Sequence, residues 1–286
     1  MHLRYFEPQE ITHAPVLQYN LRDVLVLFNG VFARGGSFNR AKGLDHRALL
    51  TDPIHELDEA AYCLEDRSYF FFGHWLRSFA QCLLPAKDTQ RIHFAATSWG
   101  HAGAYERIFD LPSLTNGQYH VARMALFQDF AQSPHKAERY KELRRRMFEH
   151  GAASVRDGKK VYLKRGATGA ARLISNEDAL EKALDVMGFD VIDLATTPIQ
   201  EMIARCVGAE VALTIEGSHT DHLHWLIKPG GTLWVLNPSN HFNTSQFGVA
   251  LSMGNRAACN IITEDGDAAY RVDLARLQDT YDLILK

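Results

Sequence analysis

The sequence predicts an α/β protein whose C-terminal half carries a parallel, Rossmann-like sheet. Strand-like and helix-like segments alternate from Val161 onward, and short connections join them. The segments Glu210–Ile215 and Thr232–Leu236 are also largely apolar, which is typical of parallel strands that helices cover on both faces. The N-terminal half is less regular and is predicted to form a second α/β domain.

The elements of the C-terminal half follow from apolar periodicity and from residues that begin or end helices. Ser175 can cap a helix that ends at Gly188, and Thr197 with Pro198 can open the next helix. The predicted strands cover residues 161–164, 190–194, 210–215, 232–236 and 258–262. The predicted helices cover residues 175–188, 197–206, 219–227, 245–253 and 270–285. The last helix is left free to cross back to the first half.

The elements of the N-terminal half are separated by a wider range of connections. Residues 23–36 are typical of a hairpin that turns at Asn29-Gly30. A highly charged segment, residues 136–151, is predicted to be a helix that Gly151 ends, and a polar stretch follows it. The remaining predicted elements are helices over residues 72–84 and 105–109 and strands over residues 91–95 and 121–127. We place the domain boundary after the charged helix, which gives domains 1–150 and 151–286.

Composition excludes several classes of protein. The formal net charge of −3 argues against general nucleic-acid binding, which needs a basic face. The chain has no apolar run of the about 20 residues that a membrane crossing needs, and its start resembles no signal peptide, so a cytoplasmic protein is expected. The cysteines, Cys63, Cys82, Cys206 and Cys259, lack CxxC spacing, so we expect neither a zinc knuckle nor a disulfide framework.

Charged and small residues follow the predicted strands of the C-terminal half. Arg165 comes after the first strand and leads through a Gly- and Ala-rich loop to Arg172 and Asn176, and Glu216-Gly217-Ser218 follows the third strand. Because ligands bind outside the carboxyl ends of parallel strands, these groups indicate a phosphate site. The alternative is that both arginines form surface ion pairs. The loop lacks the GK[ST] of a P-loop and the GxGxxG of a dinucleotide site, which disfavours ATP hydrolysis and NAD chemistry.

Three histidines, His219, His222 and His224, lie close together in the stretch TIEGSHTDHLHWL. They raise the possibility of a zinc site, but the chain has no HExxH, and positions 222 and 224 point about 200° apart on a helix. We therefore expect no bound metal. A histidine beside a bound phosphate is the preferred functional interpretation, and helix capping or packing is the alternative.

An aromatic run in the N-terminal half, YFFFGHWL, contains His74 at the start of an apolar helix. A histidine beside aromatic rings is more often a structural residue than a catalytic one. What favours function here is the combination of motifs along the chain.

These motifs together resemble glycosyltransferase family 61, the DUF563 group. The resemblance covers about residues 65–240. It is carried by Gly73-His74-Trp75-Leu76, by Lys164-Arg165 with Arg172, Asn176 and Glu177, by Glu201, and by Glu216-Gly217-Ser218 with His222 and the turn Lys228-Pro229-Gly230-Gly231. Where eukaryotic members have a Gly-His-Gly-Ala turn, this chain has EGSHTD, so His219 and Thr220 crowd the expected phosphate turn.

The resemblance implies a GT-B architecture and inverting transfer from a nucleotide-diphosphate sugar, with a UDP-sugar as the expected donor and no essential metal or other cofactor. On this basis Arg165 and Arg172 would neutralise the diphosphate, the turn Gly217-Ser218 would supply N–H donors, and Asn176 and Glu216 would orient donor hydroxyls. His222 would lie on the same donor side.

The N-terminal domain would then carry the acceptor side, with His74 as general base and Asp66 or Glu65 as substitutes. The expected acceptor is a saccharide or lipid-linked saccharide of a bacterial capsule or other surface polysaccharide. Arg144–Arg146 would contact anionic lipid at the inner face of the membrane, unless they form a solvated helix face. Two rival hypotheses are a non-catalytic scaffold of the same fold and a metal-dependent hydrolase.

Overall fold

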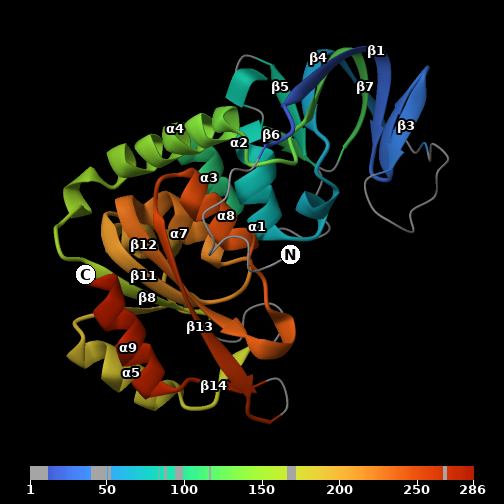
Figure 1. Cartoon of the computed structure of the whole chain (residues 1–286). Coiled ribbons are helices and arrows are strands. Elements are labelled where there is room, and N and C mark those ends of the chain that lie inside the picture. Colours follow the sequence, from blue (N-terminus) through green and yellow to red (C-terminus); the bar gives the residue numbers. More distant parts are fainter. Residues whose placement is uncertain are drawn as a thin grey trace. The chain divides into compact units, whose positions relative to one another are not determined.

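The computed structural model describes residues 12–39, 50, 53–82, 84–86, 89–93, 99–115, 117–165, 172–266 and 269–286 (Figure 1). The described chain divides into two compact units, one from Thr12 to Leu143 and one from Arg144 to Lys286. The division falls inside one helix, α4 (Pro134–His150), whereas the sequence places the boundary after residue 150. Each unit contains its own sheet and helices, so the predicted α/β class is confirmed for both.

The C-terminal unit is built on one sheet whose described strands follow the order β10-β8-β11-β12-β13-β14-β9. The first five strands in this order are parallel to one another, β14 runs antiparallel to β13, and β9 is parallel to β14. Their bounds are β8 (Lys160–Lys164), β9 (Leu173–Ile174), β10 (Asp190–Asp193), β11 (Ala209–Ile215), β12 (Ile227–Pro238), β13 (Arg256–Glu264) and β14 (Ala269–Arg271).

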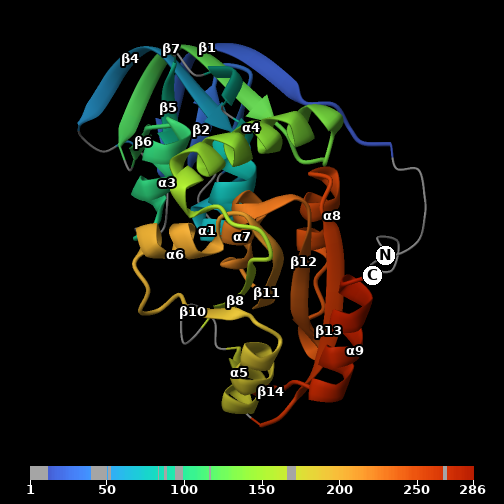
Figure 2. The same ribbon diagram turned by 90° about the vertical axis from the view of Figure 1, so that its left-hand side faces the viewer.

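Helices cover both faces of this sheet, as Figures 1 and 2 show. On one face lie α5 (Glu177–Val186) and α9 (Leu274–Ile284), and on the other lie α6 (Ile199–Cys206), α7 (Thr220–Leu226) and α8 (Ser245–Ser252). Strand residues two apart share a face. Tyr162 and Trp234 accordingly join Leu180 and Tyr281 in the core under α5 and α9. The last helix therefore packs on the sheet of its own unit.

Two local expectations for this unit are wrong. The expected turn Lys228–Gly231 lies inside β12, where the pairing with β11 shifts register between Ala209 and Val211. Ser175 does not cap α5, because its hydroxyl bonds Asp265 and the carbonyl of Tyr270 instead. Both outcomes depend on strands that pair far along the chain, which local patterns do not reveal.

The N-terminal unit has a mixed sheet in the order β3-β2-β1-β7-β4-β5-β6. Strands β3, β2, β1 and β7 pair in antiparallel fashion, and β7, β4, β5 and β6 pair in parallel. Their bounds are β1 (Leu17–Leu27), β2 (Gly30–Ala33), β3 (Gly36–Asn39), β4 (Ile54–Cys63), β5 (Gln90–His93), β6 (Ser113–Thr115) and β7 (Gln118–Gln128). The expected hairpin is present, although its turn is Phe28-Asn29 and Gly30 already pairs with Leu27.

The aromatic segment of this unit folds as one helical stretch with an irregular centre. A short 3-10 helix over Asp66–Tyr69 is followed by α1 (Phe72–His74), a π-helical turn over Trp75–Phe79, and α2 (Ala80–Cys82). The other helix of the unit ahead of α4 is α3 (Ala102–Phe109). π-Helical turns insert one residue into a helix and are frequent at functional sites. No helix in the described ranges combines the length and apolarity needed to cross a membrane.

Candidate functional site

The carboxyl ends of β8, β11 and β12 meet at one edge of the C-terminal sheet. Arg165 follows β8 directly and Glu216 follows β11, because these strands are parallel neighbours. The backbone N–H of Glu216 donates to the carbonyl of Leu236 at 2.9 Å, which places Glu216 beside the end of β12. The sequence prediction that these groups share an edge follows from the strand order.

Two arginines converge on Glu216. Nη1 of Arg172 donates to the Glu216 carbonyl oxygen at 2.8 Å and forms an ion pair with its carboxylate, and Nη1 of Arg165 donates to the same carbonyl at 3.2 Å. Arg165 is buried, and burial followed by the nearby charge of Arg172 lowers its pKa. Two guanidinium groups on one oxygen concentrate positive charge where a diphosphate would lie.

The Glu216 carboxylate is also held from the loop that follows β12. Nδ2 of Asn243 donates to Oε1 of Glu216 at 2.9 Å, and Nε2 of His241 lies 3.9 Å from Oε2. The side chain of Asn237 in turn binds the backbone N–H and carbonyl of Asn243, at 3.0 and 2.7 Å. Sequence reasoning missed Asn243 and His241. Their nearest signal was Asn237-Pro238-Ser239 at the end of a predicted strand.

Gly217 is the point at which the chain passes closest to Arg165. A Cβ atom at this position would lie 2.1 Å from Nη1 of Arg165, and the φ angle of 154° is one that residues with side chains rarely adopt. Glycine therefore allows the guanidinium to lie against the turn. Ser218 is half-buried beside it.

His219 points into the protein. Its Nε2 lies 2.8 Å from Oγ1 of Thr214, which itself donates to the carbonyl of Leu163. The threonine oxygen thus accepts from Nε2–H, which assigns the tautomer. Burial, with smaller contributions from Arg165 and Arg172, lowers the pKa of His219 to about 3, so the ring is neutral at pH 7.

The other predicted donor residues have local partners. Asn176 uses both ends of its amide on the backbone of Val272, accepting from its N–H at 3.0 Å and donating to its carbonyl at 2.9 Å. This arrangement ties the start of α5 to the segment after β14. His222 is buried within α7, and its backbone N–H donates to the His219 carbonyl.

The histidines of this region are not grouped for metal binding. Nε2 of His224 lies 2.7 Å from Oε1 of Gln246 and 3.8 Å from Oδ1 of Asp221, whereas His219 is bonded to Thr214. Among the described residues, no group of three or more His, Cys, Asp or Glu is arranged to hold a metal ion.

In the N-terminal unit, His74 lies between an acid and a base. Its Nδ1 is 3.6 Å from Oε1 of Glu65, and its Nε2 is 3.5 Å from Nη2 of Arg77. Because the guanidinium can only donate, Nε2 accepts and Nδ1 carries the proton toward Glu65. Burial, followed by the charges of Arg77 and Arg67, lowers the pKa of His74 to about 3. Asp66 begins the 3-10 helix, and its side chain lies outside the described part of the structure.

The matched part of the chain contains most of these groups. The family model described as Glycosyltransferase 61 matches residues 72–233, more than half of the chain. The chain belongs to glycosyltransferase family 61. The resemblance seen in the sequence is thereby confirmed, and the protein is a glycosyltransferase, a class that joins a sugar from a donor to an acceptor. A search of curated proteins gives no match.

The family match includes His74, Arg165, Arg172 and Glu216, but it ends before Asn237 and Asn243. The residues that hold Glu216 from the side of β12 therefore lie beyond the matched region. In this family 61 chain they complete the surroundings of a carboxylate that lies inside it.

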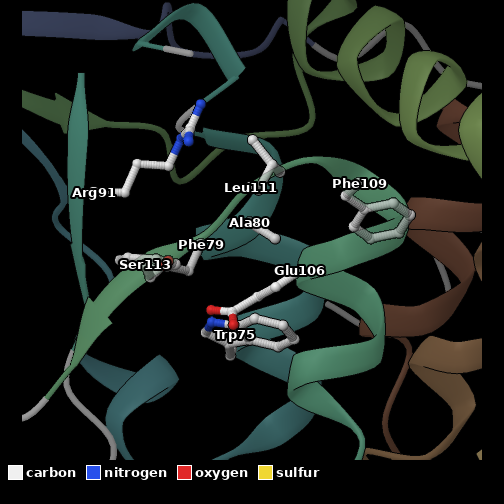
Figure 3. A pocket seen from close by; sticks show the side chains of 8 residues that line it. All are labelled: Trp75, Phe79, Ala80, Arg91, Glu106, Phe109, Leu111 and Ser113. Atoms are coloured by element: carbon white, nitrogen blue, oxygen red, sulfur yellow. The ribbon is translucent and has the colours of Figure 1, made fainter. Parts of the chain in front are cut away.

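A small cavity borders the π-helical turn of this glycosyltransferase, between Trp75, Phe79, Arg91 and Glu106 (Figure 3). Its volume of about 10 Å³ is that of a single water molecule, so it cannot hold a sugar. Burial is the main cause of the raised pKa of Glu106. The cavity is a packing feature behind the His74 segment.

Arg144, proposed from the sequence as a lipid or acceptor contact, is buried. Its guanidinium donates to the side chain of Asn255 and to the carbonyls of His224 and Met253. Burial lowers its pKa to about 10. Because Arg144 braces the C-terminal unit internally, it is neither part of a solvated face nor available to lipid.

Proposed function

We propose that this family 61 member is an inverting glycosyltransferase that uses a nucleotide-diphosphate sugar, with UDP as the nucleotide. The observation that carries the proposal is the convergence of Arg165 and Arg172 on Glu216 at the carboxyl edge of the sheet. Fixed positive charge at this position would stabilise the negative charge that develops on the leaving diphosphate. Asn243 and His241 would keep the Glu216 carboxylate in place beside the donor.

In the proposed reaction, an acceptor hydroxyl oxygen attacks the anomeric carbon on the face opposite the diphosphate. The new C–O bond forms as the bond to the phosphate oxygen breaks, and UDP leaves with the electron pair. His74 would take the hydroxyl proton at Nε2 once the acceptor replaces Arg77 there. Glu65, beside Nδ1–H, would stabilise the imidazolium that results.

The rest of the assignment extends the same hypothesis. We propose a GT-B arrangement, transfer without an essential metal, and a saccharide or lipid-linked acceptor in bacterial surface-polysaccharide synthesis at the cytoplasmic face of the membrane. The inward hydrogen bond of His219 to Thr214 supports a working donor turn, because it directs the ring away from the chain surface.

The decisive experiment is calorimetric titration of UDP into the wild type and the double variant Arg165→Ala/Arg172→Ala, each with and without EDTA. We expect micromolar binding by the wild type that EDTA leaves unchanged. Loss of two charged hydrogen-bond donors should weaken binding by about 100-fold or more. Unchanged UDP affinity in the double variant would show that the phosphate site is misplaced.

A matched control is Arg205→Ala, because Arg205 pairs with Asp190 at the opposite, amino end of β10. This variant should bind UDP as the wild type does. Arg172→Lys is a milder change that keeps the charge and removes the fork-like geometry, and it should show intermediate affinity. UDP binding without turnover of any UDP-sugar would favour the scaffold hypothesis.

A further inference from the structure

Two phenylalanines at the start of the His74 segment expose much of their side chains. Phe70 and Phe71 are each 51% exposed, although they lie next to some of the most buried residues of the N-terminal unit. We call this pair the aromatic step. Exposed apolar surface beside a functional group commonly marks a binding site.

The aromatic step is fixed by its backbone and by neighbouring rings. The N–H groups of Phe70 and Phe71 both donate to the carbonyl of Arg67, at 3.1 and 2.9 Å. Tyr69 packs edge-on against Phe70 at a centroid distance of 4.8 Å, and the Phe70 and Phe71 rings are 6.4 Å apart. The rings therefore lie on a short helical turn with little freedom of the main chain.

Polar groups adjoin this apolar surface directly. The Phe71 ring centroid is 6.0 Å from that of His74, whose Nδ1 faces Glu65. Glu65 also accepts from the backbone N–H of Arg67 and so belongs to the same turn. The surface thus combines exposed aromatic rings with an imidazole and a carboxylate on one segment.

This combination matches the chemistry of a sugar ring. A pyranose has a face of C–H groups that packs on aromatic rings and a rim of hydroxyls that needs hydrogen-bond partners. We propose that the aromatic step is the acceptor subsite, where a sugar ring of the acceptor packs on Phe70 and Phe71 and presents a hydroxyl to His74. This inference rests on the proposed function, since it assigns the acceptor side of the same reaction.

The surrounding charges favour a saccharide over a membrane. Segments that bind anionic membranes combine a broad apolar face with clusters of about four to eight cations. Here the exposed cation on the turn is Arg67, and the buried acid Glu65 adjoins it. The aromatic step is also only two rings wide, which suits one sugar ring.

Saturation-transfer NMR tests the inference on the full-length protein with maltose, cellobiose, lactose and xylobiose as probes. We expect the wild type to bind at least one of them, and Phe70→Ala/Phe71→Ala to weaken that binding about tenfold. Phe71→Trp should retain it, since an indole ring offers the same packing face. Both phenylalanines are exposed, so their replacement should leave the fold intact.

The matched control is Phe28→Ala. Phe28 is 41% exposed in the β1–β2 turn, and the pairing of Val26 with Tyr119 places it at the end of β7 opposite to Phe127, beside which β4 ends. This variant should bind the probes as the wild type does. Unchanged binding in the double phenylalanine variant, or no binding of any probe by the wild type, would overturn the inference.

Two further readouts separate the possible failures. UDP titration of the same variants should be unchanged, so loss of UDP binding by the wild type refutes the donor-site proposal and not the acceptor subsite. Sedimentation with phosphatidylcholine–phosphatidylglycerol vesicles tests the membrane alternative. Vesicle binding that the double variant loses, with saccharide binding intact, would reassign the aromatic step to lipid.

Discussion

At the scale of single residues, the donor region depends on atoms that nearly touch. Arg165 lies against the Gly217 backbone while it shares the Glu216 carbonyl with Arg172. The guanidinium position is thus set by the absence of a side chain as much as by its hydrogen-bond acceptor. A group that is positioned before the substrate arrives costs little reorganisation during the reaction.

Gly217→Ala should therefore displace the Arg165 guanidinium and strain the turn. We expect a loss of about 1–3 kcal/mol of unfolding free energy, together with weaker UDP binding, measured by urea denaturation and calorimetry. Gly254→Ala is the control, because Gly254 also has a positive φ of 75° but has open space around it. It should lose stability through backbone strain alone and bind UDP normally. Equal UDP affinity in both variants would contradict the role given to Gly217.

His219 predicts how stability depends on pH. Its pKa is about 3 in the folded protein and about 6.5 in an unfolded chain. Between these values the unfolded chain binds a proton that the native state does not, so stability falls as pH falls from about 6.5 toward 3. His74 acts in the same direction.

His219→Gln keeps a donor for Thr214 and removes this titration. Denaturation at several pH values should show a slope reduced by up to about 1.4 kcal/mol per pH unit below pH 6.5. The exposed His241 provides the comparison, since His241→Gln should leave the slope unchanged. A variant slope equal to that of the wild type would mean that His219 is protonated in the native state.

At the scale of elements, α9 closes one face of the C-terminal sheet through Tyr281. Its ring lies parallel to that of Trp234, with an interplanar angle of 8° and a centroid distance of 6.4 Å. Its hydroxyl accepts from Nζ of Lys160 at 2.7 Å and donates to the carbonyl of Met187 at 3.2 Å. One side chain thus joins α9 to β12, to β8 and to the end of α5.

Tyr281→Ala should cost about 3–5 kcal/mol of unfolding free energy, because it opens a cavity beside Trp234 and leaves Lys160 without this partner. Leu283→Ala on the same helix is the control, since Leu283 is 66% exposed and should change stability by less than about 0.5 kcal/mol. Urea denaturation measures both. Similar losses in the two variants would show that helix propensity, and not packing, determines the effect.

At the scale of the whole molecule, the sequence predicts what strand order determines. Arg165 and Glu216 could be placed together because β8 and β11 are parallel neighbours, and the alternation of strands and helices predicts that order. Asn176 shows the limit, because the direction of its amide depends on Val272, nearly a hundred residues later. Asn243 and His241 lie in a loop without periodicity, and the inward position of Arg144 depends on packing around Asn255.

The N-terminal unit was less predictable for a related reason. Its antiparallel and parallel pairings meet at β7, and the π-helical turn at Trp75 interrupts the apolar spacing by which a helix is identified. The position of His74 on a helix could be predicted from the sequence. Its neighbours Glu65 and Arg77 became evident only from the fold.

The division of the chain within α4 has an evolutionary consequence. The arginines and Glu216 belong to one compact unit, whereas Phe70 and Phe71 belong to the other and precede the residues matched by the family model. On the proposed assignment, mutations that remodel the aromatic step leave the donor residues untouched. A lineage could therefore acquire a new acceptor while it keeps its nucleotide sugar, and acceptor preference should diverge faster among relatives than donor preference.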